Sequence, residues 1–148
     1  MQKPDDRILK MLQKHHVLTL ATSVKDQPWC ASCFYAWMST ENAFVFTTDE
    51  TTRHGRESLA NQKVAANIYL ETKVVGKIRG VQVSGVIEKP EGELLDRVRK
   101  RYLKRFPYAR LMETTMWILR PNILKMTDNR LGFGKKLIWE NNKGSEIQ

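Results

Sequence analysis

The segment from Phe46 to His54 joins hydroxyl and cationic side chains where a strand should give way to a helix. Backbone N–H groups at the start of a helix attract anions, and the helix dipole strengthens that attraction. Threonine hydroxyls donate hydrogen bonds, and an arginine can bind two phosphate oxygens at once. By itself the pattern favours a capped helix with Arg53 on its surface over a phosphate site, and it leaves open whether His54 belongs to such a site or lies on the helix surface. The candidate ligands are Thr47, Thr48, Thr51, Thr52, Arg53 and His54.

Three other groups of side chains could also do chemistry. Cys30 and Cys33 have redox-motif spacing, but in a strand they point to opposite faces, which favours two unpaired cysteines. His15 and His16 also diverge as strand neighbours, so no metal site is predicted. The Gly-bearing loop at 131–136 could approach a ligand and supply lysine charge. It lacks the spacing of a nucleotide phosphate loop, and no strand–GxGxxG–helix unit indicates a classical dinucleotide fold.

A basic block with interleaved aromatic residues covers positions 97–110. Such patterning suits single-stranded nucleic acid. It also suits an amphipathic helix whose aromatic side chains, such as Tyr102 and Phe106, lie in the core while its charges are solvated. We favour the second interpretation, so nucleic acid is not the expected partner.

The elements that must position these residues follow from periodicity and turn residues. Helices are predicted at 5–14, 51–60 and 90–106. Strands are predicted at 17–22, 29–38, 43–48, 64–70, 77–88, 115–119, 123–127 and 137–140, with a loose polar tail at 141–148. The short connections leave little room for parallel crossovers. This order therefore favours a mainly β fold, an antiparallel barrel with helices at its margins.

Length and charge bound the class of protein. The chain has 148 residues, the size of one domain. Its 25 Lys and Arg against 16 Asp and Glu give a net charge of +9, which fits anionic partners such as nucleic acid, phosphorylated cofactors or acidic lipid. No apolar run has the length of a membrane span or of a signal-peptide core. We therefore expect a soluble, cytoplasmic protein with no membrane partner.

Three stretches resemble the FMN-binding split-barrel superfamily of pyridoxamine 5′-phosphate oxidase-like proteins. They are Phe-Val-Phe-Thr-Thr-Asp-Glu-Thr-Thr-Arg at 44–53, Asn-Gln-Lys-Val-Ala-Ala at 61–66 and Arg-Gly-Val-Gln-Val-Ser-Gly-Val-Ile-Glu at 79–88. Within the superfamily, the stretches 51–54, 105–110 and 131–139 are similar to the YhbP-like group, which has no assigned function. The resemblance covers about residues 10–140 in order.

The resemblance implies one six-stranded antiparallel split β-barrel over residues 1–148, with a helix in 1–14. It also implies a homodimer with two FMN molecules in grooves between the subunits. By position, Thr47 and Thr51 match hydroxyls near the phosphate and Arg53 matches its basic ligand. Gln82 matches the glutamine beside the flavin. Ser32 and Cys33 belong to the strand that flanks the flavin ring, and Lys135 and Trp139 are expected to reach the site from the partner chain.

Two departures from the family pattern shape the functional prediction. The C-terminal Arg-Leu-x-Pro motif that holds the substrate of true pyridoxamine phosphate oxidases is missing, which argues against vitamin B6 oxidation. The strand at 29–34 has no Arg or Lys, so the phosphate would depend on Arg53, His54 and Arg79. We predict an FMN-binding oxidoreductase or flavin reductase in which the flavin does the chemistry and no side chain is assigned as catalytic. The alternative is a non-enzymatic protein that binds haem or flavin, or nucleic acid through 97–110.

Overall fold

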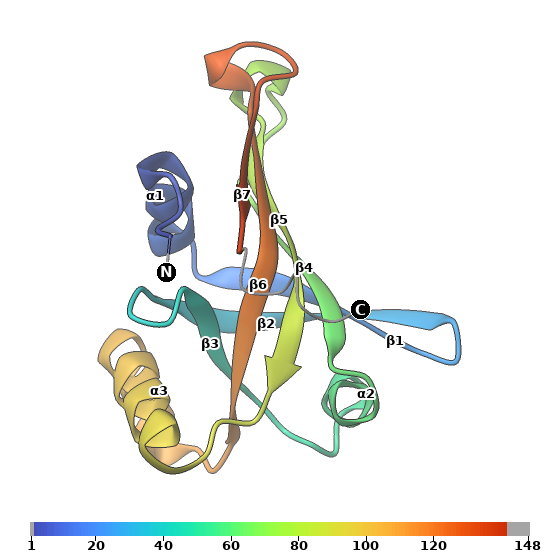
Figure 1. Ribbon diagram of the computed structural model, residues 1–148, viewed down its shortest axis with the longest axis vertical. Coiled ribbons are helices and arrows are strands. Elements are labelled where there is room, and N and C mark those ends of the chain that lie inside the picture. The colour runs from blue at the N-terminus through green and yellow to red at the C-terminus, as the bar shows by residue number, and fades with distance from the viewer. Residues whose placement is uncertain (1, 142–148) are drawn as a thin grey trace.

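The computed structural model describes residues 2–141, so all but the first residue of the tail expected at 141–148 lies outside the described residues. Within them are α1 (Asp6–Lys14), α2 (Arg53–Ala60) and α3 (Gly92–Arg105) (Figure 1). The strands are β1 (Val17–Val24), β2 (Gln27–Met38), β3 (Ala43–Thr48), β4 (Lys63–Tyr69), β5 (Arg79–Glu88), β6 (Thr115–Asp128) and β7 (Lys136–Glu140). Three 3-10 turns are η1 (Val75–Lys77), η2 (Pro107–Leu111) and η3 (Asn129–Leu131).

Six of the strands close into an antiparallel barrel. The sheet order is β3-β2-β1-β4-β5-β6-β7, and β3 also pairs with β6, so the first six strands form a ring. The last strand, β7, adds to the outside edge of β6. This architecture confirms the predicted mainly β class and the six-stranded split barrel.

Side chains alternate between the barrel interior and its outer face, as the pleat of a strand requires. In β4, Val64, Ala66 and Ile68 are buried while the residues between them are exposed. The amphipathic helix favoured from the sequence is confirmed, because Tyr102 and Phe106 are buried, and Val98 joins them in an apolar stripe along α3. The barrel interior is therefore a packed core, and ligands must bind at its ends or on its outer face.

The two strands predicted at 115–119 and 123–127 are one continuous strand, β6, so the prediction of two was wrong. Proline lacks an N–H group and usually interrupts a central strand, so a break would be usual at Pro121. Opposite it, the pairing of β5 with β6 shifts register between Ser84 and Gly85. A Cβ atom on Gly85 would overlap the carbonyl oxygen of Arg120. The bulge and Gly85 thus allow β6 to continue past Pro121.

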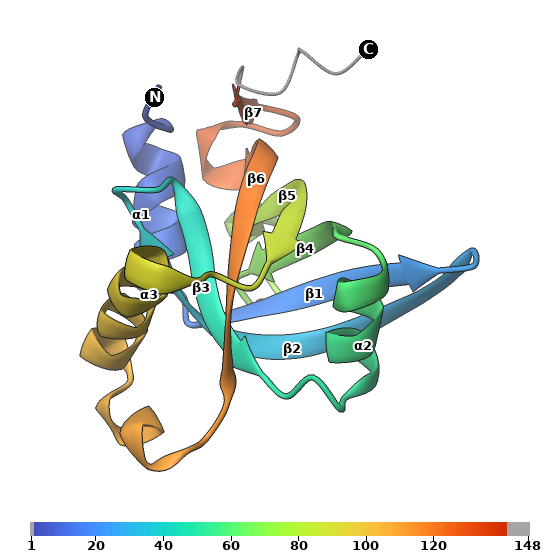
Figure 2. The same cartoon turned by 60° about the horizontal axis from the view of Figure 1, so that its bottom comes forward.

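The helices divide between the two ends of this strand (Figures 1 and 2). In Figure 1, α1 lies beside the upper part of β5, β6 and β7, whereas α2 and α3 lie toward the opposite end. A strand rises about 3.3 Å per residue, so the two ends of β6 are about 40 Å apart. Over residues 2–141, no helix is both long enough and apolar enough to cross a membrane.

Candidate functional site

The predicted phosphate segment lies where β3 passes into α2, at the end of the barrel opposite α1. Its strand end is fixed by the barrel seam, because Thr48 pairs with Thr115 at the start of β6. The indole Nε1 of Trp117 also donates to the carbonyl oxygen of Thr48 at 3.1 Å. The barrel therefore holds the first hydroxyl of the segment in place before the chain turns into the helix.

Two of the predicted threonine ligands lie against the ring of His54. Its ring Nε2 lies 2.5 Å from Thr48 Oγ1 and 3.5 Å from Thr52 Oγ1. Burial lowers the pKa of His54, and the nearby carboxylate of Glu57 opposes that shift. The imidazole is therefore neutral at pH 7 and is available to exchange hydrogen bonds with hydroxyl or phosphate groups.

The remaining hydroxyls of the segment already have partners within the chain. Thr52 is the N-cap of α2, where its Oγ1 accepts from the backbone N–H of Gly55 at 3.1 Å and donates to the carbonyl oxygen of Asp49 at 2.7 Å. The backbone N–H and the hydroxyl of Thr51 both donate to Asp49 Oδ1 at 2.8 Å. These bonds lower the pKa of Asp49, so a carboxylate sits beside the start of the helix.

Arg53 is held between a carboxylate and an aromatic ring. Its Nε donates to Glu57 Oε1 at 2.8 Å, and its guanidinium lies 4.2 Å from the ring centroid of the exposed Trp29. Glu57 also accepts from the hydroxyl of Thr22 at 2.5 Å, and the two bonds lower the pKa of Glu57. Neither Nη atom of Arg53 has a hydrogen-bond partner in the described part of the chain. One edge of the guanidinium is thus free to bind an anion.

Thr47 points away from this group. Its hydroxyl lies 3.5 Å from the phenol oxygen of Tyr102, toward α3. Successive residues of a strand face opposite sides, so Thr47 and Thr48 cannot both face α2. The structure therefore brings together Thr48, Thr52, Arg53 and His54, and it leaves Thr47 outside the group.

The residues that were expected beside the flavin ring divide between the outer face of the barrel and its core. Ser32 and Gln82 lie on the outer face in one row, joined through Thr19 and Asn67 on the strands between them. Beside this row is a groove of about 440 Å³ lined mostly by small side chains, including Ala21, Ser23, Pro28, Ala65 and Ser84. Cys33 instead faces the core, where burial raises the pKa of its thiol to about 11.

The last three candidates lie far from α2 in their own chain. Arg79 pairs across the sheet with Asp128, at the end of β6 opposite Thr115. Lys135 lines a small cavity at that same end. The side chain of Trp139 is buried, and its Nε1 donates to the carbonyl oxygen of Gln2 at 3.1 Å. Within one chain, these residues therefore cannot share a phosphate with Arg53.

The basic block at 97–110 is largely committed to internal contacts. Arg97 pairs with Glu41, and the guanidinium of Arg101 donates to a backbone carbonyl of β2. Arg105 donates to two carbonyl oxygens in the segment after α1. The aromatic side chains of Tyr102 and Phe106 lie in the core. These contacts agree with the amphipathic-helix interpretation favoured from the sequence.

Sequence reasoning overlooked Glu57 and the basic residues of α1. The Arg53–Glu57 spacing of four residues is the usual spacing of an ion pair along a helix, so the sequence did contain that signal. Arg7, Lys10 and Lys14 are likewise spaced to share one helix face. Their approach to the far end of β6 depends on tertiary packing and has no local signal.

Comparison with protein families matches residues 4–128 to the family described as pyridoxamine 5′-phosphate oxidase. A UPF0306 protein of Klebsiella pneumoniae (strain 342) is 44% identical over 137 residues, covering 93% of this chain and 93% of the relative. The UPF0306 protein YhbP of Escherichia coli O157:H7 is 42% identical over 139 residues, covering 94% of this chain and 95% of the relative.

Solved structures share the architecture at lower identity. A heme binding protein from Mycobacterium smegmatis matches with a TM-score of 0.75 at 21% identity, covering 95% of this chain and 60% of that one. An FAD-binding protein from Mesorhizobium loti matches with a TM-score of 0.68 at 15% identity, covering 81% of this chain and 91% of that one. At such identities the likeness shows a common fold.

Proposed function

The chain belongs to the pyridoxamine 5′-phosphate oxidase family, among the UPF0306 proteins that include YhbP, and from this premise we propose that it is an FMN-binding oxidoreductase. The observation that carries the proposal is the group at the β3–α2 junction. There a guanidinium edge, a neutral imidazole and two threonine hydroxyls lie together at the start of a helix. The guanidinium edge is a free donor for a phosphate monoester, and the imidazole and hydroxyls would exchange their internal hydrogen bonds for bonds to the phosphate.

The donors at the junction fit the phosphate of FMN, with two carboxylates opposing it. The free edge of Arg53 is open to an anion, whereas His54 Nε2 would have to exchange its contact with Thr48 Oγ1 for one to the phosphate. Glu57 already neutralises much of the Arg53 charge, and Asp49 adds a negative charge beside the helix start. We therefore expect the phosphate to bind with modest affinity, because it must share these cations with the protein's own carboxylates.

The rest of the cofactor is proposed to extend over the outer face of the sheet. Ser32 and Gln82 offer polar groups there, and the groove beside them is lined mostly by small side chains that leave room for a flat ring. A bound flavin supplies hydride or electron transfer. The chain itself supplies anchorage of the phosphate, orientation of the ring and shelter from water.

A second copy of the chain is proposed to cover this outer face and complete the site. Five large apolar side chains are exposed on it, which is the composition expected of a protein interface. They are Val17, Phe34, Tyr69, Ile123 and Ile138. Two proteins of the same fold are named for binding haem and FAD. Haem binding by this same homodimer is therefore the alternative.

Flavin binding tests the proposal directly. The protein is loaded with FMN, passed through gel filtration and measured by absorbance and light scattering. We expect flavin absorbance to travel with a dimer. Arg53→Ala should weaken FMN binding roughly tenfold, since it removes a charge-assisted hydrogen bond. The control Lys104→Ala removes an exposed cation of α3 that does not line the cavity beside Asp49, and it should leave binding unchanged.

Two outcomes would contradict the proposal. One is a protein that retains no flavin at any FMN concentration. The other is an equal loss of binding in Arg53→Ala and Lys104→Ala, which would indicate general charge attraction. A Soret band after loading with haemin, without flavin binding, would favour the haem alternative.

A further inference from the structure

A second group of cations surrounds a cavity at the opposite end of β6. The cavity has a volume of about 490 Å³ and lies between α1 and the paired ends of β5 and β6. We call it the basic cavity; the cations that line it are Arg7, Lys10, Lys14, Arg79 and Arg130. They come from α1, β5 and η3, so the fold brings together charges that are far apart in the sequence. A volume of this size is typical of sites for small molecules.

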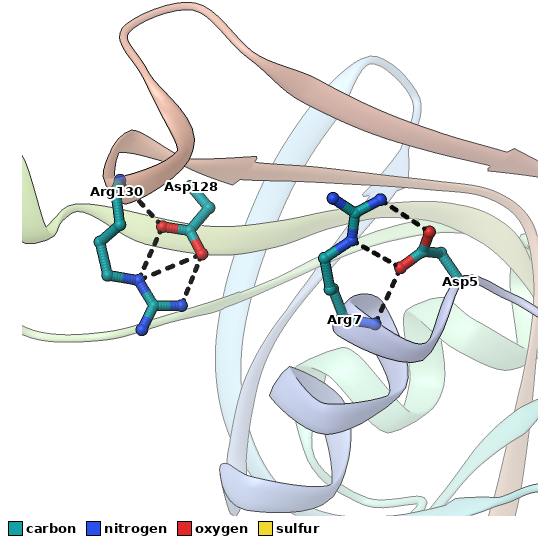
Figure 3. Close-up of polar contacts among 4 residues, drawn as sticks. All are labelled: Asp5, Arg7, Asp128 and Arg130. Atoms are coloured by element: carbon teal, nitrogen blue, oxygen red, sulfur yellow. Dashed lines mark hydrogen bonds and ion pairs between the residues drawn. The ribbon is translucent and has the colours of Figure 1, made fainter.

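Two of the arginines are held in place by carboxylates, as Figure 3 shows. Arg7 donates through Nε and Nη2 to Asp5, both at 2.9 Å. Arg130 donates through Nε and Nη2 to the buried Asp128, at 2.9 and 2.6 Å for the shorter contacts. In each case Nη1 has no hydrogen-bond partner among residues 2–141. Each guanidinium is therefore oriented in advance and still has a donor to offer.

Arg79 adds a donor that lacks a partner. Its Nε is buried, and within the described chain it makes no hydrogen bond. A buried donor without an acceptor costs free energy, so such groups are uncommon in folded proteins unless something else pairs with them. Arg79 lies opposite Asp128 in the sheet, next to the carboxylate that holds Arg130. A bound anion would satisfy this donor.

The cavity also has an apolar side. Met11 and Met126 line it and are both buried, and Leu131 stands at its edge. Among residues 2–141, Asp128 is the only acidic residue that lines it, against five cations, and Asp5 pairs with Arg7 from beside it. A neighbouring cavity of about 160 Å³ shares Arg7 and Leu131 and adds Lys135 and Lys136. The positive charge thus exceeds what the local carboxylates neutralise, in a site that also offers apolar surface.

We propose that the basic cavity binds a small organic phosphate. Its phosphate group would lie among Arg7, Arg79 and Arg130, and its organic part against Met11 and Met126. Within one chain this site is separate from the one proposed for FMN, because Arg79 and Thr48 belong to opposite ends of β6, about 40 Å apart. The inference goes beyond the proposed flavin function and does not depend on it.

Calorimetric titration with AMP tests the site in the full-length protein, with ribose 5-phosphate and inorganic phosphate as smaller probes. We expect AMP to bind one site per chain, more tightly than either smaller probe, because only AMP fills the apolar side. The double variant Lys10→Gln/Lys14→Gln should weaken AMP binding roughly tenfold, since charged donors contribute strongly to phosphate binding. Both lysines are exposed, so the variant should fold.

A matched control separates the site from general charge attraction. Lys100→Gln/Lys104→Gln removes two exposed lysines with the same spacing from α3 and should leave AMP binding unchanged. Equal weakening in both double variants would overturn the inference. So would the absence of AMP binding to the unaltered protein, or phosphate binding as tightly as AMP.

The same variants distinguish this inference from the proposed flavin function. Arg53→Ala should leave AMP binding unchanged, and the α1 lysine variant should leave FMN binding unchanged. Loss of AMP binding in Arg53→Ala would overturn the basic cavity. Loss of FMN binding in the α1 variant alone would support a phosphate site at the basic cavity and overturn the flavin site at α2.

Discussion

The two ends of β6 offer an anion opposite conditions. At the β3–α2 junction the chain has paired its own groups: Arg53 with Glu57, Thr51 with Asp49, and Thr52 with the backbone of α2. At the basic cavity, five cations face one carboxylate among the lining residues. An anion must compete with internal partners at the first site. At the second, Arg7 and Arg130 also pair with carboxylates but keep Nη1 free, and the Nε of Arg79 has no partner in the described chain.

This difference shows how much a local motif leaves undetermined. The junction has the hydroxyls, helix start and arginine that a phosphate needs, and all of them lie within one short stretch of sequence. These donors are available to a phosphate only when Glu57 and Asp49 release them, because Glu57 accepts from Arg53 and Asp49 accepts from Thr51. The basic cavity has no motif at all, yet its charges are less neutralised. Available charge, rather than motif, should therefore decide which end binds anions more tightly.

The largest effect is expected from breaking the strand that joins the two ends. A Cβ atom on Gly85 would overlap the carbonyl oxygen of Arg120, and neither backbone can move without disturbing the barrel. Gly85→Ala should therefore lower the free energy of unfolding by about 3 kcal/mol, measured by urea denaturation. Gly76→Ala is the control, because a Cβ there meets nothing within 4 Å. Equal stability of the two variants would contradict the close packing of β5 on β6.

Much of the barrel could be predicted from sequence because its signals are local. Alternation in β4 and the apolar stripe of α3 each specify one element and its buried face. The error at β6 had a tertiary cause. Pro121 ends a strand in most settings, and β6 continues only because it bulges at Asn122, next to the proline, and faces Gly85 on the partner strand. A residue's neighbour across the sheet is not visible in its own stretch of chain.

The site residues, too, could be predicted only where the signal was local in sequence. Thr48, Thr52, Arg53 and His54 were predicted as a group and lie together, since seven positions of chain hold them close. Arg79 was assigned to that group by analogy, and sheet pairing places it at the far end of β6. The faces of Ser32 and Cys33 follow from strand alternation alone. The convergence of α1 with β5 and η3 depends on the whole fold and could not be predicted.

A smaller effect is expected from removing the competition at the junction. Glu57→Gln takes away the charge that pairs with Arg53, so the guanidinium becomes fully available to a phosphate. FMN affinity should rise roughly fivefold, as expected when a charged donor is released from an internal partner. The control is Glu50→Gln, which removes the same charge from a carboxylate that pairs with Lys89 instead. Fluorescence titration with FMN measures both variants, and AMP binding at the basic cavity should change in neither.

A fall or no change in FMN affinity for Glu57→Gln would show that the ion pair positions Arg53 rather than competing for it. The two ends of β6 would then differ less than their charges suggest. An equal rise in both glutamate variants would point instead to the overall charge of the chain.

The smallest effect concerns the proton on His54. Burial lowers the pKa of His54 in the folded protein below the ordinary 6.5. At a pH between the folded-state pKa and 6.5, the unfolded chain therefore binds more protons than the folded chain. The free energy that His54 contributes to folding is therefore fully present above pH 6.5 and is lost as pH falls. Urea denaturation between pH 5 and 8 should show a shallower loss of stability for His54→Gln than for the unaltered protein. Saturating FMN should reduce that slope in the unaltered protein alone, because a phosphate beside the ring favours its protonated form. Identical slopes with and without FMN would place the phosphate away from His54 and remove the imidazole from the junction site.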